Sequence, residues 1–269
     1  MSLKSADINV MAGAAWRASR RLMRDFGEVE QLQVSKKGPA DFVSSADLKV
    51  EEKLVRELTK ARPDFGFLLE EKGAIEGRNG ACRWIIDPLD GTTNFLHGIP
   101  HFAISIALER QGEIVAGIIY QPLTDELFWA DRNRGAWIND RRLRVSGRKE
   151  LQQSVIGTGI PHLGRGDAAS FSAILSNVMP RVAGVRRFGA ASLDLAWVAA
   201  GRLDGFWEEG LSLWDIAAGT LILREAGGLV SDMDGSGRYL KTGNIVCANG
   251  ALHKPLLALV RDGLKTAAG

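Results

Sequence analysis

The sequence has little of what marks secreted, fibrous or membrane-spanning proteins. Its two cysteines, Cys82 and Cys247, lie far apart and lack the C-x-x-C spacing of zinc and redox motifs, so neither a disulfide framework nor a structural zinc site is expected. No apolar run approaches the roughly 18 residues that a membrane span needs. The N-terminal segment also lacks the hydrophobic stretch of a signal peptide. A cytoplasmic location fits these absences best.

Proline is also scarce, and charge of neither sign predominates. Eight prolines stand against 31 glycines, which favours many tight connections over a long stiff linker. The 34 Lys and Arg residues nearly balance the 32 Asp and Glu residues, so there is no global electrostatic case for a nucleic-acid or anionic-membrane partner. A hydrophobic content of 45% is enough for a sizeable core. We expect one compact unit over residues 1–269, with 1–147 and 148–269 as candidate lobes.

Two patterns of hydrophobic residues follow one another along the chain. Apolar residues at helical spacing predict amphipathic helices over 6–25 and 45–62, the second ended by Pro63. Strand candidates then predict a meander, at 65–71, 84–87, 103–110, 113–122, 126–131, 135–139 and 142–146. In the second half strands alternate with helices, which predicts a sheet covered by helices. These strands are 154–159, 184–189, 203–208, 228–232 and 244–249, and the helices are 168–180, 190–200, 214–226 and one from 251 onward. The expected fold class is α/β.

The segment from Trp84 to Phe95 carries the strongest chemical signal. It is an apolar strand that delivers Asp87 and Asp90 on either side of Pro88. Because proline fixes φ and has no N–H, the strand is expected to end there, with both acids at its carboxyl end, where α/β proteins bind ligands. Carboxylate oxygens are hard ligands that suit Mg²⁺, and the Gly91-Thr92-Thr93 run offers N–H groups and hydroxyls to a phosphate. Acids for a metal beside donors for a phosphate indicate phosphoryl transfer.

Each acidic motif also has a simpler structural interpretation. The residues from Asp87 to Gly91 are turn formers, and alone they could be a surface turn. Glu70 and Glu71 end another apolar strand, and Asp215 opens an apolar helix, where a carboxylate can serve as an N-terminal cap. Three acidic segments at such places favour one shared cluster. Two carboxylates about 4 Å apart repel by roughly 4 kcal/mol at an effective dielectric of about 20, so the cluster needs cations, protons or arginines.

Four segments together resemble the inositol monophosphatase family, whose members are Mg²⁺-dependent, lithium-sensitive phosphatases. The segments stand in family order over roughly residues 35–250. They are 41–47 (D-x-V-T-x-x-D in the family), 70–71 (G-E-E), 84–95 (W-I-I-D-P-[IL]-D-G-T-T-N-F), and 214–219 with 225–228 (W-D-x-A-A-G and E-A-G-G). The run 190–208 is similar to the bacterial inositol-1-monophosphatase branch in particular.

The resemblance implies a layered α-β-α-β-α sandwich, a homodimer, and two Mg²⁺ ions with a possible third near Glu70. The residues it assigns to the metals, with Asp87 shared by both ions, are Glu70, Asp87, the carbonyl of Leu89, Asp90 and Asp215. The implied catalytic residues, which prepare the attacking water, are Glu70, Asp47 and Thr92. The implied substrate contacts are Asp90, Gly91, Thr92, Gly189, Ala190, Ala191, Glu208 and Asp215.

Four residues, in three places, depart from the family pattern. Ser44 and Ser45 replace commoner threonines, Leu69 stands where a glycine usually precedes the two glutamates, and Ala190 replaces a Ser or Thr of the substrate loop. None of these changes removes a metal ligand. Because Leu69 is bulkier than glycine, the sequence does not decide whether a third ion binds near Glu70.

Several activities stay open within this resemblance. The favoured substrate is inositol 1-phosphate or a similar polyol monophosphate, because Glu208 could accept hydrogen bonds from hydroxyl groups, although it could also be an exposed acid beside Glu209. Related branches hydrolyse fructose 1,6-bisphosphate, 3′-phosphoadenosine 5′-phosphate or histidinol phosphate. Either Lys36 or Lys37 could add a cation near the phosphate.

An alternative from another class is a regulatory protein on a phosphatase scaffold. It would bind RNA or a transcription factor through the arginines at 141–149 or at 186–187. A solvated hairpin face is the simpler interpretation of the first cluster.

Overall fold

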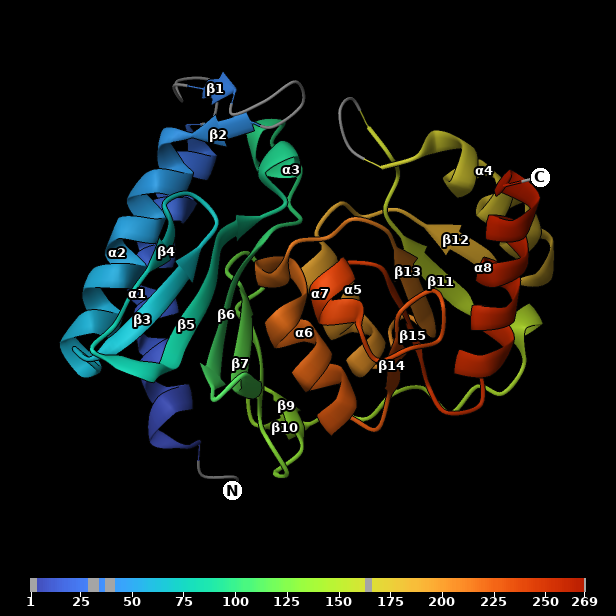
Figure 1. The fold of residues 1–269 in the computed structure, drawn as a ribbon. Helices are drawn as coiled ribbons and strands as arrows, with labels where there is room; N and C mark the ends of the chain where they lie inside the picture. Colours follow the sequence, from blue (N-terminus) through green and yellow to red (C-terminus); the bar gives the residue numbers. More distant parts are fainter. Residues whose placement is uncertain (1–3, 29–33, 37–41, 163–165, 269) are drawn as a thin grey trace.

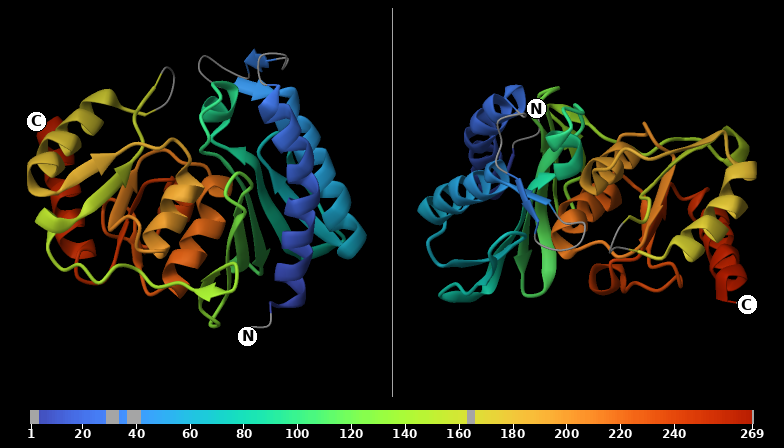
Figure 2. Two further views of the ribbon diagram at one scale, coloured as in Figure 1. Left: turned by 180° about the vertical axis from the view of Figure 1, so that it is seen from behind. Right: turned by 90° about the horizontal axis from the view of Figure 1, so that it is seen from above.

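Five layers of helices and sheets stack side by side in the protein (Figure 1, Figure 2). The structure, a computed structural model, describes residues 4–28, 34–36, 42–162 and 166–268. Its helices are α1 (Ala6–Gly27), α2 (Ser45–Ala61), α3 (Thr92–Leu96), α4 (Ala168–Val178), α5 (Ala191–Ala199), α6 (Leu213–Glu225), α7 (Tyr239–Thr242) and α8 (His253–Ala268). The layers run from α1 and α2 through a large sheet, the pair α5 and α6 and a smaller sheet to α4 and α8. The predicted α-β-α-β-α sandwich is confirmed.

The large sheet is built from residues 65–142. Its strands are β3 (Phe65–Leu69), β4 (Gly73–Ile75), β5 (Asn79–Asp90), β6 (Ala103–Arg110), β7 (Glu113–Gln121), β8 (Glu126–Asp131), β9 (Ala136–Ile138) and β10 (Arg141–Arg142). They lie in the order β10-β9-β8-β7-β6-β5-β3-β4. Only β3 and β5 run parallel; the other neighbours are antiparallel. Consecutive strands from β5 to β10 are neighbours, which confirms the predicted meander.

The smaller sheet comes from the second half of the chain. Its strands are β11 (Val155–Thr158), β12 (Gly184–Arg186), β13 (Gly205–Glu208), β14 (Leu229–Ser231) and β15 (Ile245–Ala248), in the order β12-β11-β13-β15-β14. The pairs of β11 with β12 and β13 are parallel, whereas β15 runs antiparallel to β13 and β14. Two short 3₁₀ turns flank this part, at Leu151–Gln153 and Met179–Arg181. A separate antiparallel ribbon joins β1 (Val34–Lys36) to β2 (Phe42–Ser44).

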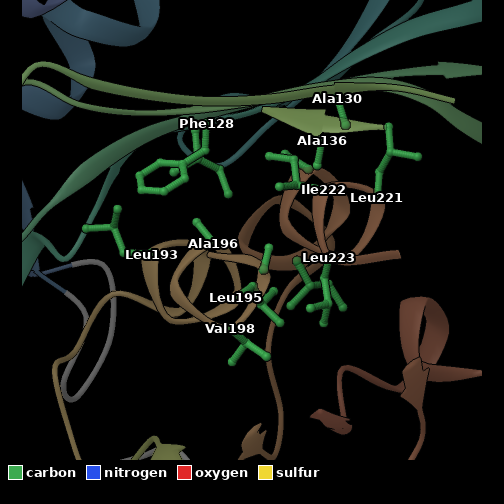
Figure 3. Close-up of a cluster of buried hydrophobic side chains, with 14 of the residues drawn as sticks. Phe128, Ala130, Ala136, Leu193, Leu195, Ala196, Val198, Leu221, Ile222 and Leu223 are labelled. Atoms are coloured by element: carbon green, nitrogen blue, oxygen red, sulfur yellow. The ribbon is translucent and has the colours of Figure 1, made fainter. Parts of the chain in front are cut away.

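The central core lies between the two sheets, where α5 and α6 are covered on both sides. Figure 3 shows Leu193 and Ala196 of α5 and Ile222 of α6 on the side that faces the large sheet, which contributes Phe128 and Ala130. The core continues to Phe206 of the smaller sheet. A helix buried on two faces cannot keep a polar side, and both helices are accordingly apolar almost all round. This middle layer holds the N-termini of α5 and α6 in place between the sheets.

The outer helices α1 and α2 instead keep the predicted amphipathic pattern. The hydroxyl of Ser5 caps α1 by accepting the N–H of Ile8 at 3.2 Å. Leu54 and Leu58 of α2 are fully buried against the large sheet's own core. Within the residues that the structure describes, no helix is both long and apolar enough to cross a membrane.

Two strand predictions are wrong in their bounds. β5 does not end at Pro88: its pairing with β6 skips residues 88–89 and resumes at Asp90, with one extra residue on β5. A bulge of this kind accommodates a proline, which has no N–H for the ladder. The strand expected over 142–146 ends at Arg142, because Leu143 turns into the core and the chain leaves the sheet to cross toward β11.

Candidate active site

A cleft of about 150 Å³ lies at the carboxyl end of β5, between the two sheets. Nearly all the site residues predicted from the sequence line it: Glu70, Asp87, Leu89, Asp90, Gly91, Thr92, Gly189, Ala190, Ala191, Glu208 and Asp215. The structure thus brings together residues that are up to 145 positions apart in sequence, from Glu70 to Asp215. Three further lining residues, Gly159, His162 and Leu211, were not among the predicted site residues. Thr93 belongs to the predicted Gly91-Thr92-Thr93 run, and Arg187 was expected only in the regulatory alternative.

The bulge of β5 shapes the metal-side wall of the cleft. The N–H of Leu89 donates to Asp87 Oδ1 at 2.9 Å, and the Thr92 hydroxyl donates to the Leu89 carbonyl at 3.0 Å. Gly91 follows with φ of +94°, and a Cβ on it would lie 2.9 Å from the carbonyl oxygen of His101. Glycine is therefore required at this turn on two grounds, its left-handed backbone and its close approach to the next strand. α3 begins directly after it, as expected for a phosphate-binding turn.

Glu70 and Asp215 enter the cleft from different elements. Glu70 follows β3, and its N–H donates to the carbonyl of Ile86 on the parallel strand β5 at 3.2 Å. Asp215 sits in the first turn of α6, where its Oδ2 accepts the N–H of Ser212 at 2.8 Å in a capping box. The predicted cap is therefore present, and the same residue also faces the cleft. The two interpretations of Asp215 are compatible, because a capping carboxylate keeps lone pairs for another partner.

The carboxylates of the cleft repel one another strongly. Burial raises the pKa of Asp87 well above its usual value, and Glu70, Asp90 and Asp215 raise it further. Burial raises the pKa of Asp215 in the same way, with Asp90 and Glu70 adding to the shift. Each of these acids is more easily protonated than a free carboxyl because burial and the neighbouring carboxylates both disfavour its ionised form. A divalent cation would remove this penalty.

The donor set fits magnesium in its chemistry. Every proposed ligand is a carboxylate or a backbone carbonyl oxygen, the hard ligands that Mg²⁺ takes. Among the described residues, no three His, Cys, Asp or Glu side chains form a preformed metal-binding cluster. The acids face one cleft, and the side chains of Asp87 and Glu70 interact directly there.

Asp90 differs from the other acids because a helix N-terminus holds it. Its Oδ2 accepts the Ser192 N–H at 2.8 Å and also the Ser192 hydroxyl, and the N–H groups of Ala191 and Leu193 contribute as well. Burial raises the pKa of Asp90 to about 6, although these donors lower it. Ser192 is a residue that the sequence did not reveal. The available signal was its place in the first turn of the predicted helix 190–200, where N–H groups are free to bind an anion.

Glu208 forms the substrate side of the cleft together with the start of α5. It ends β13, and Gly159 follows β11, the parallel neighbour of β13. A Cβ on Gly159 would lie 1.9 Å from Glu208 Oε1, so any side chain at this position would displace the carboxylate. Glu208 is half-buried and lines the cleft, whereas the simpler interpretation required an exposed acid.

Some predicted residues are placed elsewhere. Asp47 is buried in the first turn of α2 and is not among the residues that line the cleft. The Thr92 hydroxyl donates to the Leu89 carbonyl. Leu69, which replaces a family glycine, is fully buried in the core. Lys37 and the first residue of the 41–47 motif lie outside the described residues, and of Lys36 only the backbone strand is described.

The arginines of the regulatory alternative are partly engaged within the chain. Arg142 lies 5.6 Å over the ring of Trp137, and Arg148 pairs with the buried Asp204 at 3.0 Å. Arg187 lines the cleft itself. These contacts favour structural and active-site roles over a free basic surface.

The layered fold, with a cleft that gathers carboxylates beside a glycine-threonine turn, defines a hydrolase of phosphate monoesters. The chain belongs to the inositol monophosphatase family, whose model matches residues 4–265. The inositol-1-monophosphatase of Mesorhizobium japonicum is 61% identical to it over 261 residues, which cover 97% of this chain and 98% of that protein. The Nus factor SuhB of Escherichia coli (strain K12) is 41% identical over 260 residues and 97% of each chain.

A solved structure shows the same arrangement. The extragenic suppressor protein SuhB from Bartonella henselae superposes with a TM-score of 0.94 at 56% identity, over 96% of this chain and 100% of that one. The protein is therefore an enzyme of the phosphatase type with the fold of that family.

Proposed function

We propose that the protein hydrolyses inositol 1-phosphate, or a similarly small polyol monophosphate, with the help of bound Mg²⁺. One observation carries this proposal. Asp87, Asp90, Asp215 and Glu70 line the same cleft as the phosphate-binding turn at Gly91 and, on its far wall, Glu208. A cytoplasmic location and a homodimer remain predictions from the sequence.

The metal ligands follow from the donors of this cleft. Glu70, Asp87 and the Leu89 carbonyl would hold one ion, and Asp87, Asp90 and Asp215 would hold a second. Bound there, the two ions would activate a water for attack and offset the charge of the leaving oxygen. A third ion near Glu70 is part of the proposal only at high Mg²⁺ concentration.

The turn after β5 would hold the phosphate. The N–H groups of Gly91 and Thr92 stand at the start of α3 and line the cleft, where they can donate to phosphate oxygens. Because the Thr92 hydroxyl donates its proton to Leu89, its lone pairs are left to accept a hydrogen from the attacking water. Asp47 would act behind Thr92 as its carboxylate partner.

The polyol would lie against the opposite wall. Glu208 can accept hydrogen bonds from one or two hydroxyls, and Gly189, Ala190 and Ala191 present backbone groups at the start of α5. Asp90 and Asp215 would contact the hydroxyls nearest the phosphate. A sugar or inositol ring fits this mixture of one carboxylate and several backbone groups better than an apolar group.

A substrate panel tests the proposal. Phosphate release from inositol 1-phosphate would be compared with release from fructose 1,6-bisphosphate, 3′-phosphoadenosine 5′-phosphate and histidinol phosphate, with and without Mg²⁺. We expect strictly Mg²⁺-dependent turnover and a kcat/KM for inositol 1-phosphate at least about tenfold above the others. A preference for any of the other three would overturn the substrate assignment.

A further inference from the structure

Asn94 links two loops that the chain brings together from opposite sides of the cleft. Its side chain is 3% exposed. Its Nδ2 donates to the carbonyl of His101 at 2.8 Å and to the carbonyl of Phe188 at 2.8 Å, and the carbonyl of Gly189 lies at 3.5 Å. One amide group therefore connects residue 94 to residues 101 and 188, which are not neighbours in the sequence.

The first loop is the one that carries the phosphate-binding groups. Asn94 belongs to α3, directly after Gly91 and Thr92. The His101 carbonyl that it binds is also the atom against which Gly91 packs, since a Cβ on Gly91 would lie 2.9 Å from it. The hydrogen bond from Asn94 thus fixes the short helix, and with it the Gly91 turn, against the beginning of β6.

The second loop is the one that faces the substrate. Phe188 and Gly189 follow β12 at the edge of the smaller sheet and lead directly into Ala190 and α5. Gly189 has φ of +86°, and a Cβ on it would lie 3.3 Å from Asn94 Nδ2 and 2.6 Å from a nitrogen of Arg187. The Arg187 guanidinium and the amide of Asn94 therefore occupy the space that a side chain at 189 would need.

Aromatic rings shield this contact from water. The His101 ring lies 5.3 Å from the ring of Phe188 and 5.0 Å from that of Trp197, and the latter two rings are 4.9 Å apart. In such an apolar setting a lost hydrogen bond is not readily replaced by water, and the unpaired carbonyls that it leaves are costly. The link is therefore expected to be stiff.

We propose that Asn94 is a positioning residue that sets the distance between the phosphate-binding loop (Gly91–Asn94) and the substrate loop (Phe188–Ala191). The inference rests on the proposed function, because it assigns the two loops to the two halves of one substrate. Phosphate binding needs only the first loop and the metal ions that the acids would hold, whereas alignment of the polyol needs both loops at a set separation. Loss of the link should therefore lower kcat/KM for a polyol phosphate more than kcat/KM for a phosphate ester that has no polyol.

Asn249 provides a matched control. It is 4% exposed, and its Nδ2 likewise donates to two backbone carbonyls, those of Ser146 at 3.0 Å and Arg148 at 2.8 Å. Asn249 follows the last residue of β15, whereas the residue that pairs with Glu208, Ile245, is the first residue of that strand. Asn249 does not line the cleft. Its Oδ1 also accepts the N–H groups of Ala251 and Leu252, both at 2.9 Å, so Asn249→Ala should cost at least as much stability without moving either loop.

The kinetic test compares two substrates in Asn94→Ala, Asn94→Asp and Asn249→Ala. Inositol 1-phosphate uses both loops, and p-nitrophenyl phosphate has no hydroxyl for the second. We expect the Asn94 variants to lose about tenfold or more in kcat/KM for inositol 1-phosphate but no more than about threefold for p-nitrophenyl phosphate. The ratio should stay unchanged in Asn249→Ala. Equal losses on both substrates in the Asn94 variants would overturn the proposal.

Hydrogen exchange tests the link without relying on activity. Peptides that span Phe188 to Ser192 should exchange about tenfold faster in Asn94→Ala than in the parent, at matched global stability, and at the parental rate in Asn249→Ala. Unchanged exchange in Asn94→Ala would refute the link. If the parent hydrolysed none of the phosphates tested, the proposed function would fail, and the exchange result would still decide whether Asn94 couples the loops.

Discussion

Ser192 and Asp90 are joined twice: the N–H and the hydroxyl of Ser192 both donate to the same oxygen, Oδ2 of Asp90. The two residues are 102 positions apart. The contact anchors the N-terminus of α5 to the acid cluster. A carboxylate fixed at one oxygen loses less rotational freedom when the other binds an ion.

Removing the Ser192 hydroxyl should therefore weaken magnesium binding. A hydrogen bond to a charged group contributes roughly 1.5–3 kcal/mol, although the N–H groups of the helix still hold Asp90 in the variant. We expect Ser192→Ala to raise the Mg²⁺ dissociation constant by about three- to tenfold, measured by calorimetry on the protein without substrate. Unchanged affinity would show that the helix N–H groups suffice to orient Asp90.

Asp87 and Glu208 should differ in the kind of loss that their substitution causes. Asp87 is 2% exposed and stands among three other acids, so Asp87→Asn should abolish most Mg²⁺-dependent turnover, by about a thousandfold or more. Glu208→Ala should mainly raise KM for inositol 1-phosphate, by about tenfold, with kcat much less affected. Steady-state kinetics on both variants decides the matter, and the reverse order of severity would contradict the assigned roles.

The acid cluster should make the metal-free protein less stable as pH rises. The pKa of Asp90 is raised to about 6, and burial also raises the pKa values of Asp87 and Asp215. A carboxyl with a raised pKa binds its proton more tightly in the folded state, so its contribution to stability is present below about pH 4 and is lost as pH rises through about 6.

Thermal unfolding in EDTA can show this. Asp87→Asn removes one negative charge but keeps an oxygen for the Leu89 N–H. The variant should unfold at a higher temperature than the parent near neutral pH, and the gap should close at about pH 4, where the parental acids are protonated. Added Mg²⁺ should stabilise the parent above about pH 6 far more than the variant. A parent that is more stable than the variant at neutral pH without metal would contradict the predicted repulsion.

Even the small substitution Gly159→Ala should weaken substrate binding. A Cβ there would overlap the Glu208 carboxylate, at 1.9 Å from Oε1, so Gly159→Ala must displace Glu208. We expect a rise of several-fold in KM for inositol 1-phosphate and little change for p-nitrophenyl phosphate. Gly147→Ala is the control, because a Cβ at Gly147 meets nothing within 4 Å. The same loss in both variants, or on both substrates, would disconnect Gly159 from Glu208.

Lithium should inhibit the Mg²⁺-activated enzyme at millimolar concentration. This expectation comes from the family resemblance, which places the sensitive ion among Asp87, Asp90 and Asp215. Initial rates at fixed Mg²⁺ with increasing LiCl, and NaCl at equal ionic strength as the control, provide the measurement. Indifference to Li⁺ would indicate that these three acids are arranged differently from those of lithium-sensitive relatives.

Much of the fold was readable from local pattern. The helical spacing of apolar residues predicted α1 and α2, and the closely spaced strands predicted the meander from β5 to β10. The end of β5 was predicted wrongly because proline was expected to stop the strand. The bulge that accommodates Pro88 depends on how β5 pairs with β6, which the sequence of β5 alone does not show. The short strand at Arg142 was misjudged for a similar reason, since burial of Leu143 competes with strand propensity.

The residue types of the site could be recognised from the sequence. A metal ion needs carboxylates and a phosphate needs a glycine turn, whatever residues surround them. Asp87, Asp90 and Gly91 stand within one short motif and could be recognised there. Three features depend instead on distances between segments about 50 to 100 residues apart. They are the hold of a helix N-terminus on Asp90, the need for glycine at 159 beside Glu208, and the link that Asn94 makes to the loop at Phe188. Those distances arise only when α5 and α6 are buried between two sheets, because packing in three dimensions, and not the order of residues, sets them.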